Sequence, residues 1–366
     1  MKRVLFLTNY PSPYRVHFFD ELAKYAQVTV LFADRAENKK HRNAQWYTQG
    51  EGKFHAVQLK KQIAAVGSNA LCTDVTDWLK KDFDAIVVCG YSNPTVIFAM
   101  AYMRLHKIPF YMEVDGGLIR QEKKSKYLVK KHLVCMADRW LSTGYHTSKY
   151  LIHYGAREEN IVRYPFSSLY EKDILPAVVS AAEKQAIREE LGISEPHMVL
   201  AIGQFIHRKG FDVLMRAAQS LDSSVGIYIV GGEATEEYKA LREELGVSHV
   251  HFLGFQPKER LVRFYRAADL FALPTREDIW GLVINEALAY GLPTITTDRC
   301  VAGLELIEDG INGYIVPVGD AAALAERIRA VLDADREKMG AAALDKVRPY
   351  TLENMAKTHA DLFAGK

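Results

Sequence analysis

The sequence predicts an α/β fold made of two doubly wound domains. Short apolar runs alternate with amphipathic segments along nearly all of the 366 residues, which is typical of parallel sheets with helices on both faces. The alternation pauses in a looser region, residues 164–176, and then starts again. With 49% apolar and 25% charged residues, the composition excludes a largely disordered, collagen-like or disulfide-scaffold protein.

The expected elements follow this alternation in order. In the first half, the pattern predicts strands at residues 4–7, 28–32, 85–89, 110–113 and 140–142, and helices at 14–25, 95–106 and in a basic stretch after residue 117. In the second half, it predicts strands at 198–203, 225–230, 249–252, 270–273 and 294–296, and helices at 210–220, 235–245, 258–267 and 282–290. The chain is helical again from about residue 321.

We therefore predict an amino-terminal domain over residues 1–170 and a carboxyl-terminal domain over residues 171–350. A terminal helix over residues 351–366 is expected to pack back on the first domain. Ligands bind doubly wound sheets beyond the carboxyl ends of the strands. Two such sheets facing each other predict a cleft for a large substrate assembled from two parts.

Charge is distributed unevenly along the chain. The net charge is +2, but residues 1–170 carry +10 and the remainder −8. Such asymmetry suggests that the two halves face different partners. No apolar run approaches the ~20 residues of a membrane-spanning helix, and the apolar stretch after Met1 is too short for a signal peptide. The four scattered cysteines lack metal or redox spacing, so we expect structural thiols in the cytoplasm.

The loop over residues 203–210 has the features of an anion site. It follows an apolar strand and precedes a helix, where free N–H groups and the positive end of the helix dipole favour an anion. Arg208 and Lys209 add positive charge, and an arginine can hold two phosphate oxygens at once. The alternative is a solvated basic pair in an ordinary loop. The sequence order of a P-loop is absent.

A second loop, residues 274–281, carries acidic residues between a strand and a helix. Gly281 allows a ligand to approach the backbone, so the amides of Gly281, Leu282 and Val283 are available to a phosphate. Asp278 and Glu286 are placed to accept hydrogen bonds from sugar hydroxyls and a ribose diol. Alternatively, Asp278 is an acid at the start of the helix and Glu286 a surface carboxylate.

Together these motifs resemble the retaining nucleotide-sugar glycosyltransferases of family 4 (group 1), which have the GT-B fold. The resemblance is most specific over residues 198–318, and an amino-terminal match at residues 10–19 is weaker. The matching segments are Gly203…Lys209-Gly210, Phe252-Leu-Gly254-Phe, Ala268-Asp269-Leu-Phe, Asp278-x7-Glu286 and Asp309-Gly-x-Asn-Gly313.

The resemblance implies catalytic roles for Asp278, Lys209 and Arg208. Lys209 corresponds to the family's diphosphate-binding lysine, and Asp278 and Glu286 to the acids of its Glu-x7-Glu motif. Gln204 stands where the family has an arginine, whose charge Arg208 supplies, and Glu277 is a substitute for the shorter Asp278. The resemblance implies a donor site made of Gly203, Gln204, Phe255, Trp280, Gly281, Leu282, Val283 and Glu286.

In the amino-terminal domain, five residues are candidates for binding an acceptor or a sugar. Glu113 and Asp115 precede two glycines, an arrangement that suits a loop binding sugar hydroxyls and equally suits a plain turn. His146 is expected at a helix start, with a solvent-facing or core histidine as the alternative. The five candidates are Arg15, Tyr91, Glu113, Asp115 and His146.

The segment Arg120–Lys131 is strongly basic. It contains six Lys or Arg residues against Glu122 alone, interleaved with apolar side chains. Such a stretch suits an anionic membrane surface and a lipid-linked acceptor. An ordinary solvated helix is the alternative, and nucleic acid is disfavoured because no recognition motif accompanies the charge.

We therefore predict a cytoplasmic glycosyltransferase, peripheral on the inner face of the plasma membrane. It would move a hexose-type sugar from a nucleoside-diphosphate sugar, by default a UDP-sugar, to a glycan or lipid-linked acceptor. We expect it to act in cell-surface polysaccharide or glycolipid synthesis, with retention of configuration and without a metal or other cofactor. The alternatives are a non-hydrolysing sugar-nucleotide epimerase and an inactive sugar-nucleotide-binding partner subunit. A dehydrogenase is disfavoured because no strand is followed by Gly-x-Gly-x-x-Gly.

Overall fold

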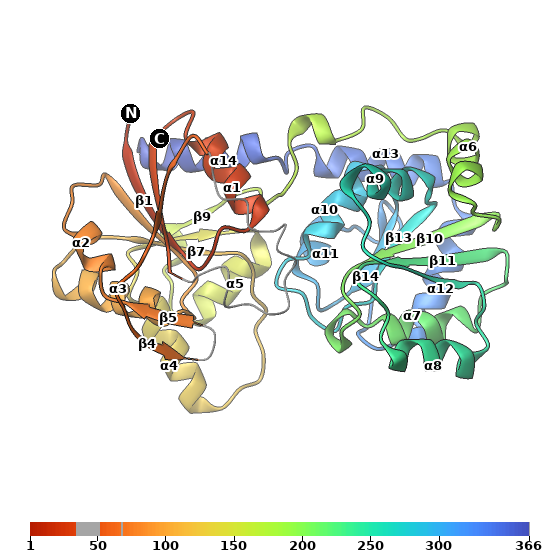
Figure 1. Cartoon of the computed structure of the whole chain (residues 1–366), viewed down its shortest axis with the longest axis horizontal. Helices are drawn as coiled ribbons and strands as arrows, with labels where there is room; N and C mark the ends of the chain where they lie inside the picture. The colour runs from red at the N-terminus through yellow and green to blue at the C-terminus, as the bar shows by residue number, and fades with distance from the viewer. Residues whose placement is uncertain (34–51, 67–68, 366) are drawn as a thin grey trace. The chain divides into compact units, whose positions relative to one another are not determined.

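The computed structural model describes residues 1–33, 52–66 and 69–365. The chain divides into two compact units, one of Met1–Tyr170 with Tyr350–Lys366 and the other of Glu171–Pro349. Each unit contains one parallel sheet with helices on both faces (Figure 1). The predicted α/β class with two doubly wound sheets is therefore confirmed.

The first unit is built on a seven-stranded sheet in the order β3-β2-β1-β6-β7-β8-β9, in which all neighbours are parallel. The strand order reverses between β1 and β6, which pair with each other. A separate antiparallel pair is formed by β4 and β5. The strands are β1 (Arg3–Thr8), β2 (Gln27–Phe32), β3 (His55–Gln58), β4 (Gln62–Val66), β5 (Asn69–Cys72), β6 (Ala85–Cys89), β7 (Tyr111–Val114), β8 (Arg139–Ser142) and β9 (Ile161–Arg163).

Helices α1 (Pro13–Leu22) and α14 (Leu352–Phe363) pack together on one face of this sheet (Figure 1). Alternate residues of a strand face opposite sides. Phe6 of β1 accordingly contacts Phe19 of α1 and Phe363 of α14, with ring centroids 5.0 and 6.3 Å apart. On the other face lie α2 (Val75–Leu79), α3 (Pro94–Leu105), α4 (Lys124–Val134) and α5 (Tyr145–His153).

The second unit has a six-stranded parallel sheet in the order β12-β11-β10-β13-β14-β15. Counted along the chain this is 3-2-1-4-5-6, the Rossmann order, whose reversal point lies between β10 and β13. All six residues of β11 are buried, as expected for a parallel strand covered on both faces. The strands are β10 (His197–Ile202), β11 (Val225–Val230), β12 (Val250–Leu253), β13 (Leu270–Leu273), β14 (Thr294–Thr297) and β15 (Gly313–Val316).

Helices cover both faces of this second sheet as well (Figure 1). One face carries α7 (Phe211–Ala218), α8 (Glu236–Leu245) and α12 (Ala321–Asp333). The other carries α6 (Ala181–Leu191), α9 (Lys258–Ala267), α10 (Leu282–Ala289) and α13 (Arg336–Val347), with α6 on α9 and α10 on α13. The short helix α11 (Val301–Leu306) packs against α10.

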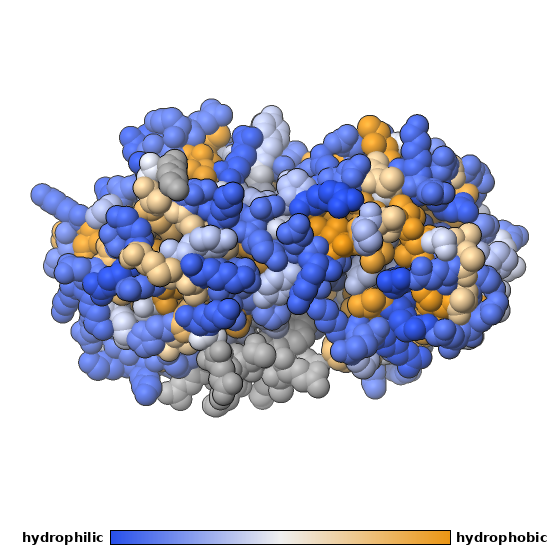
Figure 2. Space-filling view, turned by 90° about the horizontal axis from the view of Figure 1, so that it is seen from above, coloured by the Kyte–Doolittle hydropathy of each residue, from blue (hydrophilic) through white to orange (hydrophobic). Residues whose placement is uncertain are grey.

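The molecular face seen in Figure 2 is mainly hydrophilic on both units, and its hydrophobic residues form small areas. Within the described part of the chain, no helix combines the length and the apolar character that a membrane crossing requires.

The close contact of β10 with β11 generates a test of the fold. A Cβ atom on Gly231 would lie 1.8 Å from the carbonyl oxygen of Gly203, which is backbone and cannot swing away. We expect Gly231→Ala to destabilise the protein by about 1–3 kcal/mol, as overpacking does. Thermal unfolding followed by circular dichroism should show a melting temperature lowered by several degrees. Gly232→Ala is the matched control, because no atom lies within 4 Å of its Cβ position. Equal melting temperatures for the two variants would contradict this account.

Candidate functional site

The two loops singled out in the sequence follow neighbouring strands. Residues 203–210 follow β10 and residues 274–281 follow β13, and these two strands pair in parallel at the reversal point of the second sheet. Crevices at the carboxyl ends of strands beside such a point are where doubly wound sheets bind ligands. Both loops therefore lie at the favoured position of their sheet.

The three residues predicted to be catalytic lie together. Lys209 Nζ is 2.7 Å from Asp278 Oδ2, and Arg208 Nη1 is 3.2 Å from Asp278 Oδ1. The side chains of Lys209 and Asp278 are 13% and 14% exposed, whereas that of Arg208 is largely open to solvent. One carboxylate thus holds two cations, and the three groups together keep a net positive charge.

Two hydrogen bonds to one backbone carbonyl connect the two loops. The N–H of Arg276 and the hydroxyl of Thr275 both donate to the carbonyl oxygen of Arg208, at 2.8 and 2.9 Å. Gly210 has φ +70°, and a Cβ atom there would lie 2.0 Å from the carbonyl oxygen of Pro274. Only glycine fits where the loops cross, because both the backbone conformation and the space exclude a side chain.

An ion pair that we did not predict braces this crossing. Arg276 donates from Nη1 to Asp212 Oδ1 at 2.7 Å and from Nη2 to Asp212 Oδ2 at 2.6 Å, and Nη1 also donates to the carbonyl oxygen of His207 at 2.8 Å. Burial alone would raise the pKa of Asp212, but the hydrogen bond and charge of Arg276 lower it. The pair joins the second loop to the first turn of α7, and no pattern in the sequence pointed to it.

Helix α10 begins immediately after Gly281, whose φ is +100°. The first amides of an α-helix have no partner within the helix, so the Leu282 and Val283 amides are available beside the second loop. Gly281 occupies the N-cap position of this helix, so Asp278 is not the N-cap residue. The Asp278 carboxylate binds the two cations.

The other predicted donor residues have different surroundings. Glu286 is half-buried and accepts a 2.8 Å hydrogen bond from the hydroxyl of Tyr265, so it is more than a solvated surface carboxylate. Gln204 and Phe255 are exposed. Trp280 requires a correction: its side chain is 3% exposed and donates to Asn285 Oδ1 at 2.8 Å. It packs in the interior and offers no ring surface to a ligand.

In the first unit, Arg15, Glu113 and Asp115 form one cluster at the carboxyl ends of its strands. Arg15 Nη1 lies 2.6 Å from Glu113 Oε2, and Nη2 pairs with Asp115. Arg15 and Glu113 are both buried, which corrects the expectation that they present their charges to an acceptor. The Asp115 side chain is 32% exposed and is the member that a ligand can reach.

Burial and charge oppose each other in this cluster. Burial alone would raise the pKa of Glu113, but the charge of Arg15 and contacts with His359 hold it well below its usual range. For Asp115, burial and the neighbouring Glu113 charge outweigh Arg15, so its pKa is raised. His359 Nε2, on α14, lies 3.4 Å from Glu113 Oε1. Nothing local in the sequence marks His359, which reaches the cluster only through the tertiary fold.

Tyr91 and His146 lie elsewhere in the first unit. The Tyr91 hydroxyl is hydrogen-bonded to that of Tyr150 on α5, and burial raises its pKa. His146 is half-buried at the start of α5, with its ring 5.4 Å from that of Tyr145. Within residues 1–33, 52–66 and 69–365, no group of three or more His, Cys, Asp or Glu side chains is arranged to hold a metal ion.

The ion pair between Arg276 and Asp212 provides a second test. In a double-mutant cycle with Arg276→Gln and Asp212→Asn, we expect a coupling energy of about 1–2 kcal/mol at neutral pH, as for partners in one hydrogen-bond network. Because the native pKa of Asp212 is lowered, the coupling is present above the unfolded pKa of about 3.9 and disappears as the pH falls through the native value.

Urea unfolding at pH 7 and at pH 3 measures both effects. The control cycle uses Lys239 and Glu236, an exposed pair 2.7 Å apart, for which no measurable coupling is expected. Equal coupling in the two cycles would show that the Arg276–Asp212 pair is only a surface contact.

One family profile matches within the second unit, and sequence relatives match over a longer part of the chain. The profile of the family described as "Glycosyl transferases group 1" matches residues 183–346. A D-inositol 3-phosphate glycosyltransferase of Nocardia farcinica is 33% identical over 258 residues, which cover 64% of this chain and 54% of the relative. A protein of the same name from Corynebacterium aurimucosum is 31% identical, over 66% of this chain and 60% of the relative. The chain thus spans somewhat more than half the length of these relatives.

Solved structures resemble the whole chain. Anabaena HepE, solved in complex with UDP, superposes with a TM-score of 0.77 at 20% identity, covering 100% of both chains. Sucrose-phosphate synthase from Thermosynechococcus elongatus gives a TM-score of 0.76 at 18% identity, also over 100% of both chains. These likenesses concern the fold, and the predicted GT-B fold is confirmed. Over residues 183–346 the chain is similar to the group 1 glycosyl transferases, and along its whole length it shares the fold of these solved structures.

Proposed function

We propose that this chain is a retaining glycosyltransferase that moves a hexose-type sugar from a nucleoside-diphosphate sugar to a glycan or lipid-linked acceptor. The observation that carries the proposal is the cluster of Arg208, Lys209 and Asp278 at the reversal point of the second sheet, beside the start of α10. Two cations and free helix amides in one place suit a diphosphate. We further propose a cytoplasmic role in cell-surface polysaccharide or glycolipid synthesis.

In the proposed reaction, the bond between the anomeric carbon and the diphosphate oxygen breaks, and a bond to the acceptor oxygen forms on the same face of the sugar. The acceptor's proton passes to a phosphate oxygen of the departing diphosphate. Negative charge grows on that diphosphate, so Lys209 and Arg208 stabilise the transition state more than the ground state. These cations take the part that a divalent metal plays in other enzymes, and we propose a metal-independent reaction.

The carboxylates have separate proposed tasks. Asp278, which already orients both cations, accepts a hydrogen bond from the donor sugar. Glu286, held by Tyr265, accepts from the ribose diol. In the first unit, Asp115 is the exposed member of the Arg15 cluster and is our candidate for binding an acceptor hydroxyl.

A uridine donor is supported by the fold relative from Anabaena, which was solved with UDP and with UDP-glucose. The names of the sequence relatives make a phosphorylated polyol, inositol 3-phosphate, a further acceptor to test.

We also propose that Arg120–Lys131 rests on an anionic membrane surface. Of the residues in α4, only Val134 is buried. Leu128 and Val129 are exposed, and Lys123, Lys124, Lys126 and Lys131 are exposed with them. Apolar side chains beside lysines suit the boundary between headgroups and acyl chains.

Removal of the Lys209 charge tests the donor site. We expect Lys209→Ala to weaken UDP binding by about 10–100-fold, because a charge-assisted hydrogen bond contributes ~1.5–3 kcal/mol. Isothermal titration calorimetry measures this, and Lys239→Ala on the exposed face of α8 is the control. Unchanged UDP affinity in Lys209→Ala would refute the phosphate role.

A panel of nucleotide sugars, offered with lipid-linked, glycan and inositol 3-phosphate acceptors, tests the reaction itself. Transfer with retention is expected, and epimerisation at the carbon next to the anomeric one would establish the epimerase instead. Binding of a nucleotide sugar without turnover would indicate an inactive partner subunit. If no nucleotide sugar binds, the proposed function is refuted.

The membrane proposal is tested by co-sedimentation with vesicles of anionic and neutral lipid. Lys124→Glu with Lys126→Glu should weaken binding to anionic vesicles by tenfold or more, since each near-surface cation contributes about 1 kcal/mol. The control, Lys107→Glu with Lys357→Glu, makes the same change of charge at exposed positions of the same unit. If the bound fraction does not depend on salt concentration or on lipid charge, the membrane proposal is refuted.

A further inference from the structure

The second unit has a pocket at the other end of its sheet from Lys209 and Asp278. Its volume is about 610 Å³, and it is lined by the starts of α6 and α13, by His197 at the beginning of β10 and by Asp269 just before β13. At about 3.3 Å per residue, the six residues of β10 separate the two ends of the sheet by roughly 17–20 Å. A ligand in this pocket is therefore distinct from a nucleotide at the first site.

One ion pair on the pocket wall is already complete. Arg188 Nη2 lies 2.7 Å from Asp269 Oδ2, while its other nitrogens donate to the carbonyl oxygens of Ala267 and Pro196 at 2.9 and 2.7 Å. Asp269 Oδ2 also accepts from the N–H of Met198 at 2.9 Å. Both side chains are buried, and each neutralises the other. This pair connects α6 to the sheet, and it has no net charge with which to bind a ligand.

Lys184, one turn earlier on α6, is not satisfied in this way. Its Nζ is 3.9 Å from Asp269 Oδ1, which is beyond hydrogen-bond distance, and it has no hydrogen bond to any residue that the structure describes. Its side chain is only 13% exposed. Burial lowers the pKa of Lys184, and the charges of Arg188 and Arg336 lower it further against the opposing effect of Asp269. An ammonium group with three donors therefore faces the pocket without an acceptor.

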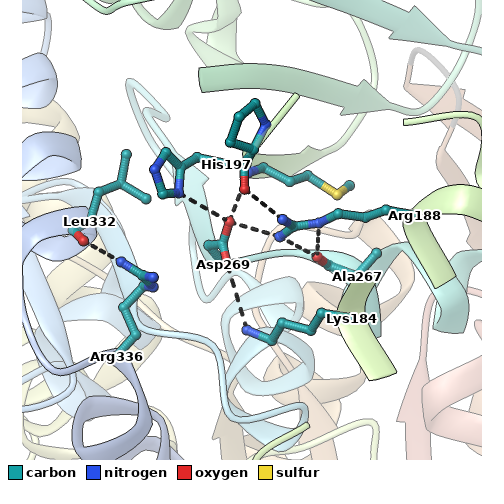
Figure 3. Close-up of polar contacts among 9 residues, drawn as sticks. Lys184, Arg188, His197, Ala267, Asp269, Leu332 and Arg336 are labelled. Atoms are coloured by element: carbon teal, nitrogen blue, oxygen red, sulfur yellow. Dashed lines mark hydrogen bonds and ion pairs between the residues drawn. The ribbon is translucent and has the colours of Figure 1, made fainter. Parts of the chain in front are cut away.

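Arg336 and His197 line the same pocket (Figure 3). Arg336, the first residue of α13, uses Nη1 to donate to the carbonyl oxygen of Leu332. His197 Nδ1 lies 3.9 Å from Asp269 Oδ2. Figure 3 shows Lys184 and His197 reaching Asp269 from different sides, with Arg336 beside them.

The charges in the pocket do not balance. Lys184, Arg188 and Arg336 face the single carboxylate of Asp269, while the positive ends of α6 and α13 lie at the rim. Two acids also line the rim, but Asp335 and Glu337 are exposed, and Asp335 already accepts from the N–H of Lys338 at 3.0 Å. Among the buried and half-buried charged residues of the lining, cations thus exceed carboxylates by two, which matches a dianion.

We propose that this pocket binds a phosphorylated small molecule, with its phosphate held by Lys184 and Arg336. A phosphate gives the Lys184 ammonium the acceptors that the protein does not supply, and it screens Lys184 from Arg336. The fork of a guanidinium and the point charge of an ammonium are the usual protein partners of phosphate. The volume falls in the range of small-molecule sites, so there is room for an organic group attached to the phosphate. The proposal does not depend on the transferase function.

Inorganic phosphate is the probe that tests this site. The full chain should carry Lys209→Ala, so that the loop after β10 does not take up the phosphate. In this background we expect calorimetric binding at constant ionic strength, weakened about tenfold or more by Lys184→Met or Arg336→Gln, each of which removes a charge-assisted contact. Lys184→Arg should keep most of the affinity. The control Lys239→Met, at an exposed lysine of the same unit, should leave it unchanged.

A second measurement reports on Lys184 without altering it. Acylation of lysines, followed by mass spectrometry of peptides, gives the modification rate of each residue. Phosphate should slow acylation of Lys184 severalfold and leave Lys239 unaffected. The proposal is overturned if neither Lys184→Met nor Arg336→Gln changes phosphate affinity. It is also overturned if chloride at equal ionic strength protects Lys184 as well as phosphate does. If Lys184→Met fails to fold, protection in the chain that retains Lys184 decides the question.

Discussion

The carboxylate of Asp278, shared by Lys209 and Arg208, is the contact around which the second unit's site is arranged. It joins two loops that are distant in sequence, and it requires those loops to cross at close range. Gly210 makes the crossing possible because any side chain would meet the carbonyl oxygen of Pro274. The fork from Arg276 to Asp212 then holds the crossing in register. Without these two supports, the cations would be ordinary solvated side chains with no fixed geometry.

Local charge matters more than the charge of a whole half. The second half carries −8 overall, yet it contains both of the clusters that we propose bind phosphate groups. Lys209 and Arg208 face Asp278 at one end of the sheet, and Lys184 and Arg336 stand beside the closed Arg188–Asp269 pair at the other. A charge count alone would have put anion binding in the basic first half. The position of an anion site is set by helix N-termini and buried cations within a few ångströms of the anion.

Much of the fold could be predicted because parallel strands buried on both faces leave a plain signal. β11, β13 and α9 have the bounds that the sequence indicates. The edge strands β3 (His-Ala-Val-Gln) and β9 (Ile-Val-Arg) were missed, because they are short and partly exposed and so lack an apolar run. The predicted helix over residues 14–25 ends at Leu22, and no change of periodicity in the sequence marks that end.

Site residues could be predicted where they stand in a recognisable loop motif. They could not be predicted where their role depends on how deeply the fold buries them. Arg208, Lys209 and Asp278 meet because β10 pairs with β13, and the family resemblance had already assigned all three to one site. The burial of Trp280, and of the Arg15–Glu113 pair, depends on contacts that composition cannot show. His359 enters the first unit's cluster from the far end of the sequence, so only the folded chain brings it beside Glu113.

That return of α14 makes the first unit discontinuous in the chain. The ribosome releases residues 1–170 long before it makes the helix that covers Phe6, Phe18 and Glu113. Until then this face of the nascent sheet exposes aromatic rings and a carboxylate without its histidine neighbour. The second unit, whose residues 171–349 are continuous, can complete its core first. The half of the protein that is synthesised first is therefore the half whose folding is completed last.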